Sequence, residues 1–170
     1  MKKNLVIIAA RGIGDLIYHL PLLRSLYECY NQKLTIISNQ VNHAKEVYKF
    51  EDFHNEIIEF ENTRFSILKT LKAIINFKNL INKYNADQLI LTASPRRLMA
   101  PVYLSNAKKK IIFGGGKLVF TKDKKYQSLT HAEKIMKYTE SLNLPTIKKD
   151  FFLSKPNFSI KNDVRKFKIF

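Results

Sequence analysis

Apolar residues along the chain follow two alternating patterns: short continuous runs, and longer stretches with an apolar residue every three or four positions. Continuous runs such as 5–9 are typical of strands buried on both faces of a sheet, and stretches such as 16–30 of amphipathic helices. The runs predict strands at 5–9, 34–38, 55–60, 88–92 and 110–113. The longer stretches predict helices at 16–30, 42–50, 64–84, 96–105 and 129–142.

Strands that alternate with helices in this way predict an α/β fold, a Rossmann-like doubly wound parallel sheet. Such sheets bind ligands in the crevice at the carboxyl ends of their strands. The segments that follow the strands at this edge are 10–15, 39–42, 93–97 and 114–117. Beyond Pro145 the chain becomes polar and basic, so we expect one domain over residues 1–148 and a different unit over 149–170.

The composition of the 170 residues, with 45% hydrophobic and 12% aromatic positions, is that of a globular protein. No apolar run approaches the ~20 residues that span a bilayer, and the run at 5–10 is too short for the core of a signal peptide. Cys29 is the only cysteine, so a disulfide within the chain is impossible. These features predict a cytoplasmic protein.

The net charge of +16 predicts attraction to phosphate groups on a sugar, an anionic lipid or a nucleic acid. An AT-rich coding sequence also favours lysine and asparagine, so we attribute part of the excess to codon bias. The sequence has no recognition helix, aromatic platform or zinc-finger spacing that would indicate specific nucleic-acid binding. The four histidines show no metal-ligand spacing, and we expect no metal site.

The most informative stretch, residues 10–16, joins the first predicted strand to the first predicted helix. Gly12 and Gly14 predict a tight backbone turn that leaves room for a ligand. Asp15 is expected at or next to the helix N-cap, where capping alone is worth ~1 kcal/mol. The same position favours an ionised carboxylate that accepts a proton from a sugar hydroxyl. Both roles remain open on the sequence alone.

Two common nucleotide motifs do not fit. A dinucleotide fingerprint needs a third glycine near position 17, which is Ile17, and an acidic residue at the end of the second strand, where Asn39 stands. A P-loop needs Gly-Lys followed by Ser or Thr, and the only Gly-Lys pair precedes Leu118.

The stretch Gly12-Ile13-Gly14-Asp15-Leu16, followed by Leu20-Pro21-Leu22-Leu23, resembles the opening of the ADP-heptose:lipopolysaccharide heptosyltransferases, glycosyltransferase family 9. Pro21 would lie inside the predicted helix 16–30, where proline costs ~3 kcal/mol unless its surroundings accommodate it. Weaker similarities to the family occur at 86–91, at 94–97, at 106–114 and at His131, which heads the last predicted helix.

The resemblance implies the N-terminal half of a GT-B glycosyltransferase, whose two Rossmann-like halves enclose the active site. It implies inverting transfer of a sugar from an ADP-activated donor to a lipopolysaccharide core acceptor, with no cofactor and no catalytic metal. The family's catalytic aspartate maps onto Asp15, in the acceptor-side half. The nucleotide-sugar donor is expected to bind a C-terminal half that is absent here, of which 149–170 is either the start or only a tail.

Six further residues are candidates for acceptor binding because they lie at the predicted crevice edge: Gly12, Gly14, Arg11, Ser94, Arg96 and Arg97. Arginine forks suit phosphate or carboxylate, although each arginine can equally be a solvated loop charge, and Ser94 can simply cap a helix. We expect His131 to stabilise the start of its helix.

The lysines of helix 64–84 suit peripheral contact with an anionic inner membrane, where the acceptor is a phosphorylated glycan or is linked to lipid. For its apolar stripe (Phe65, Leu68, Leu71, Ile75, Ile81) we favour packing on the sheet. Two alternatives stay open: half of another GT-B or nucleotide-sugar enzyme, and a non-catalytic basic α/β module that binds anionic membrane or nucleic acid.

Overall fold

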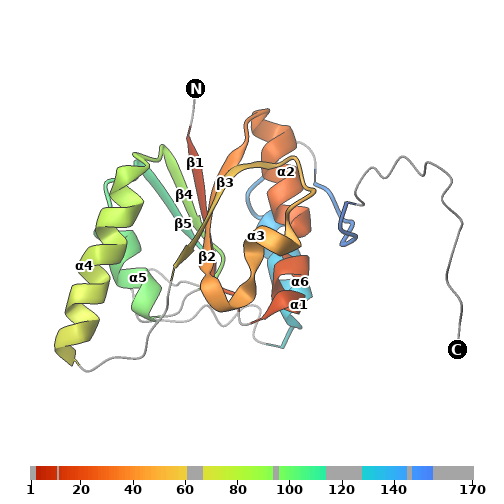
Figure 1. The fold of residues 1–170 in the computed structure, drawn as a ribbon. Coiled ribbons are helices and arrows are strands. Elements are labelled where there is room, and N and C mark those ends of the chain that lie inside the picture. Colours follow the sequence, from red (N-terminus) through yellow and green to blue (C-terminus); the bar gives the residue numbers. More distant parts are fainter. Residues whose placement is uncertain are drawn as a thin grey trace, which may run out of the picture.

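The computed structural model describes residues 3–10, 12–60, 67–93, 96–113, 128–144 and 147–154, with the backbone alone at 67–70 and 96–97. The described chain contains a parallel sheet of five strands in the order β3-β2-β1-β4-β5 (Figure 1). The strands are β1 (Asn4–Ile8), β2 (Leu34–Asn39), β3 (His54–Phe60), β4 (Gln88–Leu91) and β5 (Lys109–Ile112). The predicted strands are confirmed, with ends that differ by one residue or less.

Helices cover both faces of the sheet, which confirms the doubly wound α/β prediction. Val6 and Ile8 of β1 pack under α1 (Ile13–Tyr18), α2 (Leu20–Tyr30) and α6 (His131–Glu140). Leu5 and Ile7 point to the opposite face, under α4 (Ile67–Lys83) and α5 (Arg96–Tyr103). β1 is buried along its whole length because it lies at the centre of both cores.

The first predicted helix, 16–30, is in fact two helices. α1 ends at Tyr18, α2 begins at Leu20, and His19 lies between them. Pro21 therefore occupies the first turn of α2, where its missing N–H has no partner within the helix to lose. The prediction of a proline inside a helix is wrong, and so is the energetic cost attached to it. The predicted helix 42–50 is also divided, into the 3₁₀ turn η1 (Gln40–Asn42) and α3 (Ala44–Val47).

The apolar stripe of α4 does not all face the sheet. Phe77 and Ile81 are buried in the core, whereas Leu71 and Ile75 are 55% and 56% exposed. The preference for packing on the sheet is therefore wrong for Leu71 and Ile75; the side chains of Phe65 and Leu68 lie outside the described residues. None of the described helices is long and apolar enough to cross a membrane.

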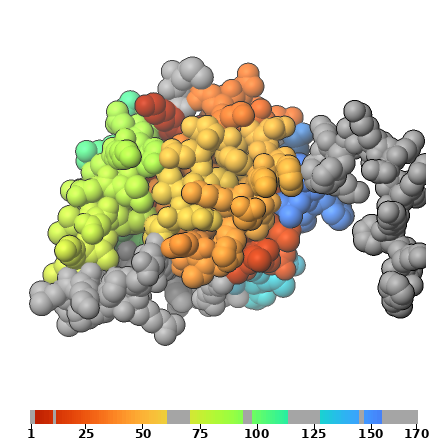
Figure 2. Space-filling model, in the orientation of Figure 1, coloured from red at the N-terminus to blue at the C-terminus, as the bar shows by residue number. Residues whose placement is uncertain are grey.

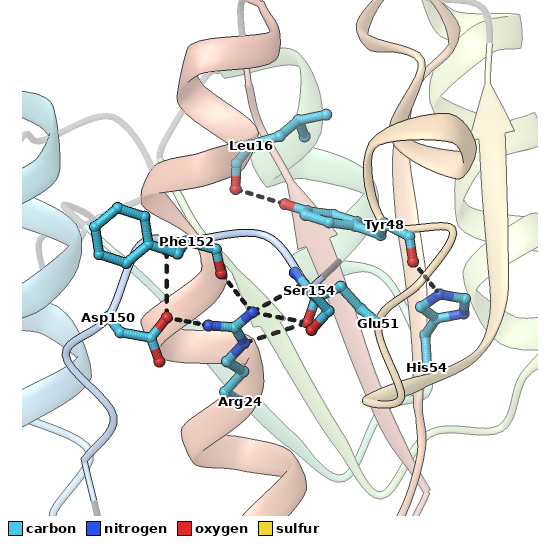
Figure 3. A network of polar contacts seen from close by, with 8 residues as sticks. All are labelled: Leu16, Arg24, Tyr48, Glu51, His54, Asp150, Phe152 and Ser154. Atoms are coloured by element: carbon cyan, nitrogen blue, oxygen red, sulfur yellow. Dashed lines mark hydrogen bonds and ion pairs between the residues drawn. The ribbon is translucent and has the colours of Figure 1, made fainter. Parts of the chain in front are cut away.

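Residues 147–154 return to the first half of the chain and lie against α2 (Figure 2). The backbone N–H of Lys148 donates to Ser25 Oγ at 2.8 Å. The Arg24 guanidinium lies between the carboxylates of Glu51 and Asp150 and donates to the Phe152 carbonyl at 2.7 Å (Figure 3). This segment therefore packs on residues 1–148, while the domain boundary at 148 and the nature of 155–170, which lie outside the described residues, stay predictions.

Candidate functional site

The carboxyl ends of three adjacent strands are tied together by side-chain hydrogen bonds. The N–H of Ala9, just after β1, donates to Thr92 Oγ1 after β4 at 3.2 Å. Asn42 Nδ2 in η1 donates to the Ala10 carbonyl at 3.1 Å. The chain winds outward from β1 to β3 and then returns to β4 on the other side, so β1 and β4 flank the topological switch point. Open α/β sheets bind their ligands at this point.

α1 starts at this edge and presents Asp15 there. Gly12 is the N-cap, and the Asp15 N–H donates to its carbonyl at 3.2 Å. Asp15 is thus the third residue of the helix, and the N-cap has no side-chain hydrogen bond. Asp15 lies three residues after the N-cap, so the prediction that it lies at or next to the N-cap is wrong. The carboxylate still benefits from the positive end of the helix dipole.

Neither glycine of the motif is needed for a turn. Gly12 has φ −172° and ψ −179°, which is extended backbone open to any residue, and Gly14 has no positive φ either. The tight-turn part of the prediction is wrong, because α1 simply begins after an extended residue. A Cβ added at Gly12 or Gly14 would meet none of the described residues within 4 Å, so among them the two glycines leave open space beside Asp15. That this space receives a ligand stays a prediction.

His131, at the start of α6, lies close to Asp15 although the two residues are far apart in the sequence. Its Nε2 lies 4.0 Å from Asp15 Oδ1, and the two side chains are 35% and 23% exposed. This distance is too long for a hydrogen bond, but it allows electrostatic attraction when the imidazole is protonated. The start of α6 is stabilised by Thr130 and Glu133, which form a reciprocal capping box. A contribution of His131 to the helix start stays a prediction.

His19 completes the group of ionisable side chains around α1. Its ring is fully buried, and Nδ1–H donates to the Asp15 carbonyl at 2.5 Å. Its ring centroid lies 5.8 Å from that of His131. Burial, which disfavours the charged ring, lowers the pKa of His19 to about 4. The hydrogen bond that the ring donates to the Asp15 carbonyl raises this pKa, and repulsion from His131 lowers it further. His19 is therefore neutral at physiological pH and supports the helix that carries Asp15.

The depressed pKa of His19 predicts that stability falls in mild acid. Between about pH 6.5 and 4 the unfolded chain binds a proton at this residue and the folded chain does not, so the free energy of unfolding falls as the pH falls. The full contribution is about 3 kcal/mol, present above pH 6.5 and lost by pH 4. Asn at position 19 keeps an N–H donor for the Asp15 carbonyl but does not titrate.

We therefore expect the free energy of unfolding, measured in urea, to fall less between pH 6.5 and 4 in His19→Asn than in wild type. The expected difference is about 3 kcal/mol. The exposed His43, replaced by Asn, is the matched control. Equal pH profiles for wild type and His19→Asn would show that burial of His19 does not affect stability in this way.

A buried tyrosine holds the junction between α1 and α2 in place. The Tyr48 hydroxyl donates to the Leu16 carbonyl at 2.6 Å, and His54 Nε2 donates to the Tyr48 carbonyl at 2.9 Å (Figure 3). Burial and then the charge of Glu51 raise the pKa of Tyr48 well above its usual value, so it remains a hydrogen-bond donor. Leu16 follows Asp15 directly, so this bond restrains the backbone next to the carboxylate.

The other predicted site residues are only partly described. Arg96 and Arg97 open α5, which follows β4 at the same sheet edge as Asp15, but their side chains lie outside the described residues. Arg11 and Ser94 lie wholly outside them, and so does the triple glycine 114–116. Within the described ranges no group of three or more His, Cys, Asp or Glu side chains could hold a metal ion.

Sequence reasoning missed His19 and the closeness of His131 to Asp15. Pro21 was the available signal for His19, because a proline belongs in the first turn of a helix and so marks a new helix start just before it. Nothing local signals the contact with His131, which joins residues far apart in the chain.

No known protein-family profile matches the chain, and no curated protein matches its sequence. Solved structures do match its fold. A family 9 glycosyltransferase from Veillonella parvula DSM 2008 matches with a TM-score of 0.65 and 17% identity, over 89% of this chain and 43% of that one. Escherichia coli heptosyltransferase WaaC with ADP matches with a TM-score of 0.59 and 14% identity, over 87% of this chain and 51% of that one.

The same E. coli enzyme with ADP-2-deoxy-2-fluoro heptose gives a TM-score of 0.58 and 15% identity. This chain thus spans about half the length of the glycosyltransferases it matches. It has the α/β fold found in about half of a heptosyltransferase or family 9 glycosyltransferase.

Proposed function

We propose that this chain is the acceptor-side domain of an inverting glycosyltransferase similar to the heptosyltransferases, and that Asp15 is its general base. The observation that carries the proposal is the position of the Asp15 carboxylate. It projects from the first turn of α1 at the switch point of the sheet, beside His131 and the open space over Gly12 and Gly14. The fold shared with family 9 glycosyltransferases supports the same reading.

In the proposed reaction, Asp15 accepts the proton of an acceptor hydroxyl while that oxygen bonds to the anomeric carbon of the donor sugar. The bond from the anomeric carbon to the phosphate oxygen breaks, and the nucleoside diphosphate leaves on the opposite face. His131, 4.0 Å from the carboxylate, would stabilise its charged form when the imidazole is protonated. A positioned general base of this kind contributes ~10²–10⁴-fold to the rate.

The proposed acceptor is a phosphorylated glycan of the cell surface, free or linked to lipid. The net charge of +16 favours phosphate groups, and Arg11, Ser94, Arg96 and Arg97 are its proposed ligands together with the surface over the two glycines. The nucleotide-sugar donor is proposed to bind a second half-domain, because this chain spans about half of the heptosyltransferase whose solved structures carry ADP or an ADP-sugar analogue.

Binding by the isolated chain tests this division of roles. We expect association with phosphorylated lipopolysaccharide core oligosaccharide, measured by calorimetry, to weaken as salt rises, because exposed charges are screened. We expect little or no affinity for ADP-heptose. Tight stoichiometric binding of ADP-heptose, with none of the oligosaccharide, would assign the chain to the donor side.

Gly14→Ala separates binding from stability in the same experiment. A methyl group there meets no atom of the described residues within 4 Å, so it should raise the free energy of unfolding by about 0.5–1 kcal/mol through helix propensity. It should also weaken oligosaccharide binding, because it fills the space beside Asp15. Asn79→Ala, on the exposed surface of α4, is the control that raises helix propensity without touching this edge.

A further inference from the structure

Two apolar side chains on α4 are exposed to solvent and belong to neither hydrophobic core of the described residues. Leu71 and Ile75 are one turn apart, on the same face of the helix, and each is more than half exposed. Lys78 is three residues beyond Ile75 and shares this face, and the exposed Lys72 flanks it. Single exposed apolar residues are common, but a pair bordered by lysines forms a patch, here called the α4 outer face (Leu71, Lys72, Ile75, Lys78).

The charges of α4 are of one sign. Its sequence carries Lys69, Lys72, Lys78 and Lys83 and no aspartate or glutamate. Lys83 in the last turn suits the helix dipole, but Lys69 in the first turn opposes it. Helix stability therefore does not account for the lysines in the first half of α4. A helix with a basic and apolar outer face fits a negatively charged surface that also accepts apolar groups, such as a bilayer with anionic lipids.

The position of α4 relates this face to the candidate site. Phe77 and Ile81 fix the opposite side of the helix in the core, so the outer face is carried rigidly by the domain. α4 forms one flank of the molecule (Figure 2), and its first turns lie at the same end of the sheet as α1 and Asp15 (Figure 1). A surface that holds this flank would lie close to the carboxyl edge of the sheet.

We propose that the α4 outer face docks on anionic phospholipid bilayers, with Leu71 and Ile75 entering the headgroup region and Lys72 and Lys78 contacting lipid phosphates. The contact deepens the proposed function, because it would bring Asp15 to an acceptor linked to lipid. The docking itself does not depend on sugar transfer and is tested without it.

The test is sedimentation of the full chain with vesicles of phosphatidylcholine and phosphatidylglycerol in equal amounts. We expect binding to these vesicles and much weaker binding to pure phosphatidylcholine. Leu71→Ser with Ile75→Ser should weaken binding about tenfold, because two partly inserted apolar side chains are lost. Lys72→Glu with Lys78→Glu should weaken it at least as much, since each lysine near such a surface contributes about fivefold.

Charge-matched and apolar controls decide whether the effect belongs to α4. Lys45→Glu with Lys49→Glu makes the same change of net charge on exposed lysines of the opposite flank, and Leu104→Ser removes an exposed leucine after α5. We expect both controls to bind nearly as wild type does. Equal losses in the α4 variants and the controls, or no loss in either α4 variant, would overturn the proposal.

Two further measurements separate the alternatives. If the chain binds a single-stranded oligonucleotide but no vesicles, and the lysine variant abolishes that binding, α4 is a nucleic-acid surface and the proposal fails. Asp15→Asn should bind vesicles as wild type does, so loss of sugar transfer alone leaves the docking proposal standing. Circular dichroism of each variant is expected to match wild type, because all the changed side chains are solvent-accessible.

Discussion

Replacing Asp15 by asparagine should lower the rate of sugar transfer by about 10²–10⁴-fold, the usual contribution of a positioned general base. Asparagine keeps the size of the side chain but cannot accept the proton of the acceptor hydroxyl. Asn is close to Asp in size and lies at the third residue of α1, so the structural cost includes a weaker interaction with the dipole of α1 and with His131. We expect the free energy of unfolding to fall by less than about 1 kcal/mol.

The measurement needs a donor-binding half, supplied by fusing that of a heptosyltransferase to this chain. Transfer rate, acceptor affinity and thermal midpoint are compared for wild type, Asp15→Asn and Asp52→Asn, which removes an exposed carboxylate outside the site. The rate of the Asp15 variant should fall while its midpoint and acceptor affinity stay close to those of wild type. If a folded Asp15→Asn fusion keeps more than about a tenth of the rate, Asp15 is not the base.

The sheet could be predicted closely because its strands are buried on both faces. A strand such as β1 reads as an unbroken apolar run from Leu5 onward, and its whole length is buried. Alternation of strand and helix then leaves few possible topologies, and right-handed crossovers of this kind give parallel order. The crevice edge and the place of Asp15 follow from the same reasoning.

The break between two helices, the exposure of single side chains and the contacts between residues far apart in the chain could not be predicted in this way. A continuous apolar stripe from 16 to 30 hides the break at His19, because both helices bury the same face. The exposure of Leu71 and Ile75 depends on how far α4 extends past the sheet, which periodicity does not reveal. The approach of His131 to Asp15 requires α6 to return to α1 after a long excursion of the chain.

The second large effect concerns stability and the contact between α2 and residues 147–154. Arg24→Met should lower the free energy of unfolding by about 3–5 kcal/mol, because it leaves the carboxylate of Glu51 buried without its cation. The Glu51 side chain is 3% exposed, and its oxygens accept bonds from Arg24 at 2.8, 3.0 and 3.2 Å. Burial disfavours the guanidinium charge, but the bonds to Glu51 and then Asp150 outweigh it and raise the pKa of Arg24.

For a chain of this length the loss corresponds to a thermal midpoint lower by roughly 10 °C. Lys148→Met is the matched control, since its pair with Glu28 spans 2.7 Å with both side chains more than two-fifths exposed and should contribute at most about 1 kcal/mol. Arg24→Met with Glu51→Met removes the buried charge together with its partner and should recover much of the loss. If Arg24→Met is no more harmful than Lys148→Met, the Arg24–Glu51 pair does not hold this part of the domain together.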